Sequence, residues 1–176
     1  QDVLNILELI SGGIMPTMGT KYSGCIDLYS REDVIIEGGK TELIPLGVKI
    51  NPTKLSEALK DLDQYEFNEF LLTHHILLKI RSGLSKKLML ANGVGEIDLD
   101  YPGEFMARVY NPTMPTLRKK FDDNKNLIDV ELISGTPVVI HRGDKVAQIS
   151  LEQHKTSMFG IFFFFFRTGG FGSTGA

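Results

Sequence analysis

Short stretches of β-branched or alternating apolar residues, separated by turn residues, make up most of the chain. They lie at 34–36, 41–50, 76–80, 105–110, 128–133, 137–140 and 146–151. Gly, Asn, Pro or Asp flanks these stretches, which is typical of strands that end in turns. The spacing predicts an all-β sandwich or barrel.

One segment has helical spacing instead. From Thr53 to about Phe70, apolar positions recur every three or four residues, at Leu55, Ala58, Leu59, Leu62, Tyr65 and Phe70. Thr53 or Ser56 is a possible cap at the start of this segment. The pattern predicts one amphipathic helix, at about 53–70, inserted between strands.

A long surface loop is expected at 111–126. This segment contains Pro112, Pro115 and a cluster of adjacent lysines and aspartates. Its charges are interpreted as solvated.

Composition limits the function classes. A chain of 176 residues is long enough for one domain with a core. The net charge of −3 and the pI near 5.8 argue against a nucleic-acid polymer as partner, while a small anion held by local donors stays possible. Cys25 is the single cysteine, and no apolar signal segment is visible, which favours a reducing, cytoplasmic location.

An apolar run at 158–166 ends in five consecutive phenylalanines. It is far shorter than the ~20 residues that cross a bilayer, so no membrane partner is expected. In water such a run is prone to aggregate unless another subunit covers it.

The carboxy-terminal residues 168–175 are mostly glycines and small hydroxyl residues around one ring, Phe171. They indicate a tail that becomes ordered on a ligand, with Phe171 stacking on a planar group. Ser173, Thr174 and backbone N–H groups could hold phosphate. A frayed terminus is the alternative.

Two further segments carry candidate chemistry. Arg81-Ser82-Gly83-Leu84-Ser85 follows a strand and offers an oxyanion clamp. The bend at 92–95 leads into a strand predicted to present Asp98 and Asp100 on one face, where a carboxylate could act as general base. A surface turn and a polar hairpin are the alternatives for these two segments.

Asp27 lies between apolar residues and could be a hydrogen-bond hub or could hold water around a metal ion. The segment 143–149 is predicted to be a turn followed by a strand, in which Gln148 faces either the core or the solvent. His74 and His75 are adjacent, so in a strand they face opposite ways and make a poor metal pair. A zinc site is therefore not expected.

Taken in order, five segments resemble the five motifs of the trimeric deoxyuridine triphosphatase (dUTPase) family. They are SGCIDL at 23–28, RSGLS at 81–85, NGVGEIDLDYPGE at 92–104, GDKVAQI at 143–149 and GGFGSTG at 169–175. The resemblance implies a dUTPase-like β-clip or jelly-roll barrel that forms a homotrimer. It also implies Mg²⁺-dependent hydrolysis of dUTP to dUMP and pyrophosphate, with active sites between subunits.

The same resemblance implies roles for individual residues. Asp98 would be the general base that activates the attacking water. Uracil would be read by Asn92, Glu96 and Ile97, and Tyr101 would pack on the deoxyribose. The remaining site residues are Arg81, Ser82, Gly83 and Gln148 for the phosphates, Asp27 for Mg²⁺ through water, and Arg167, Phe171, Gly172 and Ser173 in a tail contributed by a neighbouring chain.

The resemblance also implies two parts of the chain, a β domain at 1–166 and a flexible tail at 167–176. Three positions depart from the family pattern. Ile80 stands where proline is usual before RSG, and Phe166 stands where the fifth motif has a basic residue, with Arg167 one place late. The helical segment at 53–70 lies where the family is much shorter, and it is a possible contact surface for a protein partner.

Two alternatives remain beside dUTP hydrolysis. The related dCTP deaminases use a glutamate in the strand after the third motif, and Arg108 occupies the matching place here. A dUTPase-fold regulator, of viral or phage origin and acting in the host cytoplasm, would bind a protein through 53–70. It need not exclude catalysis.

Overall fold

The fold is built almost entirely of short antiparallel strands. The computed structural model describes residues 3–155. Its strands are β1 (Leu7–Leu9), β2 (Thr17–Met18), β3 (Ile26–Tyr29), β4 (Val34–Ile36), β5 (Thr41–Pro45), β6 (Val48–Ile50), β7 (His74–Ile80), β8 (Met89–Leu90), β9 (Gly95–Asp98), β10 (Met106–Tyr110), β11 (Thr116–Phe121), β12 (Leu127–Ile133), β13 (Val138–Ile140) and β14 (Lys145–Gln153). Single-turn 3₁₀ helices η1 (Val3–Ile6) and η2 (Leu84–Lys86) add to these.

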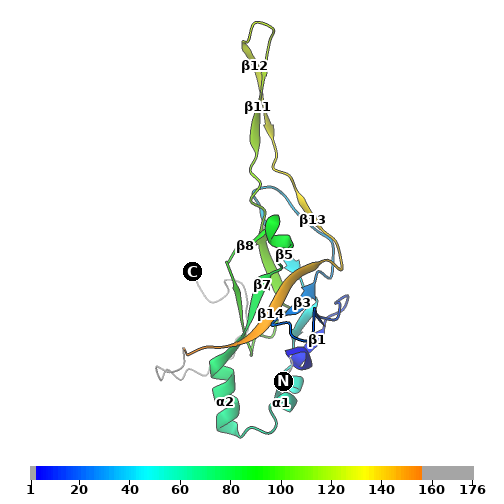
Figure 1. Ribbon diagram of the computed structural model, residues 1–176, viewed down its shortest axis with the longest axis vertical. Helices are drawn as coiled ribbons and strands as arrows, with labels where there is room; N and C mark the ends of the chain where they lie inside the picture. Colours follow the sequence, from blue (N-terminus) through cyan, green and yellow to red (C-terminus); the bar gives the residue numbers. More distant parts are fainter. Residues whose placement is uncertain (1–2, 156–176) are drawn as a thin grey trace.

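The largest sheet has the strand order β2-β3-β14-β7-β9, and every pair in it is antiparallel. A second sheet, β5-β10-β8, and the pairs β1-β6 and β4-β13 enclose the core with it (Figure 1). The predicted all-β class is confirmed.

The five-stranded sheet has one apolar and one polar face. Ile26, Ile149 and Leu78 are cross-strand partners on β3, β14 and β7, and all three are buried. One residue along each strand, Asp27 pairs with Gln148 and Gln148 with Lys79. Because successive side chains in a strand point to opposite faces, this polar row lies on the face away from the core.

The stretch 41–50 is two strands rather than one. β5 ends at Pro45, and Gly47 has a positive φ of 69° before β6 begins. The backbone of Gly47 also packs on Gly13, where a side chain on either residue would collide with the other. Only glycine combines this backbone conformation with such a close approach.

The helical insert contains two helices, so the prediction of one helix at 53–70 is wrong in that detail. α1 (Pro52–Ala58) begins after Asn51, whose side chain accepts a hydrogen bond from the Lys54 N–H. α2 (Gln64–Thr73) begins after Asp63, which forms a capping box with Glu66. This capping box starts a new helix and thereby separates the two. Neither helix is long and apolar enough to cross a membrane, and the rest of 3–155 contains none that is.

The segment 111–126 is not the predicted loop. Residues 116–133 form an antiparallel two-stranded arm, β11 with β12, that projects from the body (Figure 1). Ion pairs join its strands on one face, where Arg118 lies opposite Glu131 and Lys120 opposite Asp129. Lys120, from the cluster predicted to be solvated, therefore takes part in a ladder of ion pairs.

The tip of the arm is closed by Asp122. Its carboxylate accepts hydrogen bonds from the backbone N–H groups of Asn124 and Asn126 and from the Asn126 side chain. The bonds from Asn126 lower the pKa of Asp122. Lys125 completes the turn with a positive φ of 64°.

We predict that the arm is dispensable for folding. Replacing residues 115–134 with a short Gly-Asn turn should leave the thermal unfolding midpoint within about 2 °C, since surface changes away from core contacts shift stability little. Differential scanning calorimetry measures this. A shorter body deletion, of β13, is the contrasting control and should unfold the protein. A large drop in midpoint on removing the arm would show that it supports the core.

Candidate active site

Strand β7 organises the candidate site. It pairs with β14 on one side and with β9 on the other. Arg81 directly follows its carboxyl end, and Asp98 lies opposite His75 near its amino end. Two groups of site residues are therefore fixed to one strand. We call them the Arg81 patch (Asp27, Arg81, Ser82, Gly83 and Gln148) and the Asp98 patch (Glu96, Ile97, Asp98 and Tyr101).

The Arg81 patch is centred on a buried carboxylate. The Asp27 side chain is only 3% exposed. A guanidinium nitrogen of Arg81 lies 2.7 Å from one of its oxygens, and Nζ of Lys145 lies 3.1 Å from the other. A buried charge requires such partners because desolvation is costly. Asp27 is thus a hub of charged contacts in the structure, and its role at a hydrated metal ion stays a prediction.

The turn after β7 presents donors to solvent. The Arg81 N–H donates to the Val146 carbonyl at 3.0 Å, which joins the turn to β14. Ser85 Oγ donates to the Ser82 carbonyl at 2.7 Å, and η2 follows. Ser82 and Gly83 themselves are exposed. The turn is thus shaped by its own hydrogen bonds and leaves the Ser82 hydroxyl facing water.

Lys145 is a site residue that sequence reasoning missed, although it belongs to the segment GDKVAQI. The hydrogen bond to Asp27 raises the pKa of Lys145. With Arg81 it gives the patch two cations against one carboxylate. Gln148 lies beside them as the cross-strand partner of Asp27, and its amide donates to the Ile80 carbonyl. The patch can therefore attract an anion.

A magnesium ion ligated directly by the protein does not fit this patch. Both oxygens of Asp27 already face cations. Across residues 3–155, no group of three or more His, Cys, Asp and Glu side chains is arranged to hold a metal. Magnesium usually takes one or two carboxylates together with substrate phosphates and waters. Asp27 could contact such an ion only through water.

The Asp98 patch lies at the edge of the large sheet. β9 is the last strand in the order β2-β3-β14-β7-β9. Ile97 packs toward the core, whereas Glu96 and Asp98 are exposed. The outer backbone groups of an edge strand are available to pair with another molecule. This patch thus combines an exposed carboxylate with the last strand of the sheet in the described part of the chain.

Tyr101 is held next to Asp98 by a turn. Its N–H donates to the Asp98 carbonyl at 3.0 Å. The Tyr101 ring is half-buried against the core and lies so close to Gly103 that any side chain there would collide with it. The turn therefore fixes Tyr101 close to Asp98 in the structure.

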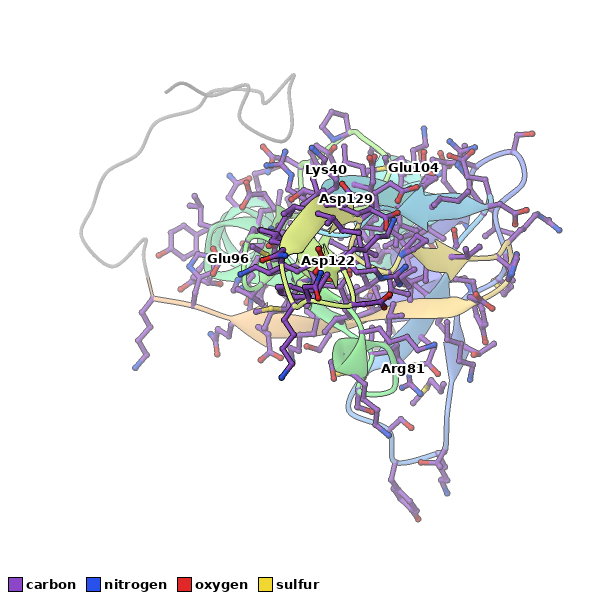
Figure 2. All side chains as sticks on the ribbon, turned by 90° about the horizontal axis from the view of Figure 1, so that it is seen from above. Lys40, Arg81, Glu96, Glu104, Asp122 and Asp129 are labelled. Carbon is purple, nitrogen blue, oxygen red and sulfur yellow. The ribbon has the colours of Figure 1, made fainter. Side chains whose placement is uncertain are left out.

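The two patches are far apart within one chain. Asp98 is level with position 75 of β7, and Arg81 lies six residues further along. At about 3.3 Å per residue the separation is roughly 20 Å. Figure 2 shows the labelled Glu96 and Arg81 on different sides of the molecule. A single chain does not bring a base at Asp98 to an anion held at Arg81.

Two local expectations for the third motif are wrong. β9 ends at Asp98, so Asp100 lies in a turn and shares no strand with it. The segment 92–98 is no hairpin either, because β8 pairs with β10 and β9 pairs with β7. The Asn92 bend connects two sheets, and Gly93 supplies its positive φ of 72°.

The adjacent histidines are separated as predicted. His74 stacks on Phe70, and His75 lies against His154. The tail residues Arg167, Phe171, Gly172 and Ser173 lie outside the described residues, so their roles and the division at 166 stay predictions. The protein partner expected at 53–70 also stays a prediction.

No family model matches the chain. Curated relatives do match. The chain is 28% identical, over 85% of its length and 74% of the relative's, to the deoxyuridine 5'-triphosphate nucleotidohydrolase of Mycobacterium avium (strain 104). It is 29% identical, over 86% of its length and 64% of the relative's, to the enzyme of the same name from Corynebacterium efficiens. Over most of its length the chain is therefore similar in sequence to deoxyuridine 5'-triphosphate nucleotidohydrolases.

Solved structures share the dUTPase fold. The dUTPase of Streptococcus mutans aligns with a TM-score of 0.57 at 23% identity, covering 85% of this chain and 95% of that one. The dUTPase of phage phi11 of Staphylococcus aureus, in a structure described as showing a structural Mg(II) ion, aligns with a TM-score of 0.58 at 22% identity, covering 85% and 90%. A staphylococcal phage 80alpha dUTPase mutant with dUpNHpp aligns at 0.59 and 21%, covering 97% of both chains.

The ion pair of Lys145 predicts a stability change at alkaline pH. Because the folded-state pKa of Lys145 is raised above its usual value of about 10.5, the contribution of the ion pair to stability is complete below that pH. It is lost as pH rises through the folded pKa. Thermal melts should therefore show Lys145→Met less stable than the parent at pH 8 to 9, with the difference shrinking above about pH 10.5. Lys119→Met, on the arm, is the control. A constant difference would argue against the ion pair.

Proposed function

We propose that this chain hydrolyses dUTP to dUMP and pyrophosphate in sites shared between copies of the chain. The separation of the two patches carries this proposal. An exposed carboxylate and an anion-attracting patch at opposite ends of β7 cannot act on one triphosphate within a single chain. Association of copies brings one chain's Asp98 patch to another's Arg81 patch, as in the homotrimer that the family resemblance implies.

Asp98 is the proposed general base. Its carboxylate is exposed at the end of an edge strand, where a bound water can approach it. Accepting a proton from that water while it attacks the α-phosphorus makes the water a stronger nucleophile. The turn to Tyr101 fixes the position of the Asp98 backbone relative to the bound sugar.

The other residues of the Asp98 patch would recognise uracil and the deoxyribose. Outer backbone groups around Glu96 and Ile97 can pair with the edge of uracil, with Asn92 beside them. Tyr101, supported by Gly103, would pack on the deoxyribose. A ring held in that position leaves no space for a 2′-hydroxyl, which selects against ribonucleotides.

The phosphates belong to the Arg81 patch. Arg81 and Lys145 supply charge, while Ser82, Gly83 and Gln148 supply hydroxyl, backbone and amide groups. A Mg²⁺ ion carried by the triphosphate, with Asp27 contacting its water shell, would neutralise charge on the leaving pyrophosphate. Arg167, Phe171, Gly172 and Ser173 would close the site from a neighbouring chain.

The alternatives have less support. Arg108 lies on β10 where a deaminase would need glutamate. A regulatory role through a protein partner at 53–70 is compatible with catalysis, and the exposed Tyr65 and Leu72 of α2 offer contact area for it.

The base assignment is tested by Asp98→Asn. The amide cannot take the proton, so pyrophosphate release from dUTP should fall at least about 100-fold while binding of a non-hydrolysable analogue persists. Asp100→Asn, two residues away, is the matched control and should keep parental activity. Parental protein should release little pyrophosphate from UTP or dCTP. Undiminished turnover in Asp98→Asn would remove the assignment.

The shared site is tested by mixing two inactive variants. Arg81→Ala inactivates the Arg81 patch, and Asp98→Asn inactivates the Asp98 patch. After subunit exchange, one site in four combines an intact Asp98 patch with an intact Arg81 patch, so about a quarter of parental activity should return. Each variant exchanged with itself is the control. If Arg81→Ala fails to fold, Ser82→Ala replaces it. A mixture as inactive as its parts would place the whole site within one chain.

A further inference from the structure

An apolar groove lies between the helical insert and the end of the large sheet. Val3 and Ile6 of η1, Leu55 and Leu59 of α1, Phe70 of α2 and Leu151 of β14 line it. No charged side chain contributes to this lining. Figure 1 shows the two helices and the end of β14 together at one end of the molecule, opposite the arm.

The walls of the groove are held by specific contacts. Nζ of Lys54 donates to the Leu7 carbonyl at 2.8 Å, which ties α1 to the strand that follows η1. The Phe70 ring stacks on His74 with 4.0 Å between ring centroids. The groove is therefore part of the folded domain. Water in the groove contacts apolar side chains, which is unfavourable.

The described chain ends beside this groove. Gln153 is the last residue of β14 and pairs with His74. The next N–H, of His154, donates to the Thr73 carbonyl at the end of α2, at 2.7 Å. Phe70, one turn earlier on α2, forms the groove wall. Any residue that follows Lys155 therefore starts within reach of the groove.

The residues that follow have the matching chemistry. Eight of the nine positions from Met158 to Phe166 are apolar, and none is charged. Three residues beyond Lys155 cover at most about 10 Å, enough to bring Met158 to the groove. Burying phenylalanine side chains removes a large apolar surface from water, so leaving this run exposed to water is unfavourable.

We propose that Met158–Phe166 docks in this groove in its own chain. The helical insert then serves as the anchor of the carboxy-terminal segment. It also determines where residues 167–176 leave the domain. This inference does not depend on dUTP hydrolysis, and its tests measure no activity.

Disulfide trapping tests the contact. In a Cys25→Ser background, Ala58→Cys on the groove wall is combined in turn with Met158→Cys, Gly160→Cys and Phe162→Cys. Mild oxidation of a mixture of ¹⁴N- and ¹⁵N-labelled protein, followed by peptide mass spectrometry, separates bonds within a chain from bonds between chains. We expect at least one pair to form mainly within a chain.

The matched control places the partner cysteine on the arm, as Leu117→Cys with the same three positions. It should form no bond within a chain. If no Ala58 pair exceeds this control, or if the bonds join different chains, the proposal is wrong. In the second case the occupant is the segment of another copy.

A fluorescent reporter gives an independent measurement. The chain contains no tryptophan, so Phe70→Trp reports on the groove alone. Replacing 158–166 with a Gly-Ser linker should expose the indole and shift its emission to longer wavelength by several nanometres. Phe121→Trp on the arm is the control and should not respond. Identical spectra with and without 158–166 would contradict the docking.

Discussion

The pairing of β7 on both of its edges is the constraint on which the rest of the structure depends. Its register with β14 places Gln148 beside Asp27, and its register with β9 places Asp98 level with His75. A slip of one residue would turn Ile76 and Leu78 away from the core, because side chains alternate between faces. The burial of these two residues therefore fixes the distance between the patches, and this distance is the basis of the proposal that two copies share a site.

The buried Asp27 connects this register to the chemistry. Its carboxylate lies on β3, Lys145 begins β14, and Arg81 follows β7, so one charge holds three adjacent strands. Removing either cation leaves the buried Asp27 carboxylate with one cationic partner instead of two. This costs more folding free energy than the loss of a surface ion pair. The same cations give the patch its excess of positive charge. Stability and the proposed anion binding thus depend on the same side chains.

Two insertions extend from opposite ends of this body, and different local rules form them. The arm is held by cross-strand ion pairs and by Asp122 in its turn, with hardly any support from the core. The helical insert begins each helix at a capping residue and packs Leu55 and Phe70 toward the body. The insert thereby forms one wall of an apolar groove near the end of β14.

The sequence by itself located many of the strands, because period-two alternation and turn residues are local signals, but it left out β1, β2, β3, β8 and β11 and joined β5 to β6. It also identified the motif residues, because their side-chain types indicate the chemistry that they can perform. It did not determine the arm, since the ladder that joins Lys120 to Asp129 depends on pairing across the turn. It likewise could not separate α1 from α2 or find Lys145 at Asp27, 118 residues away. Only the tertiary structure decided that Asp98 and Arg81 lie apart, because that distance follows from strand register, which no single segment contains.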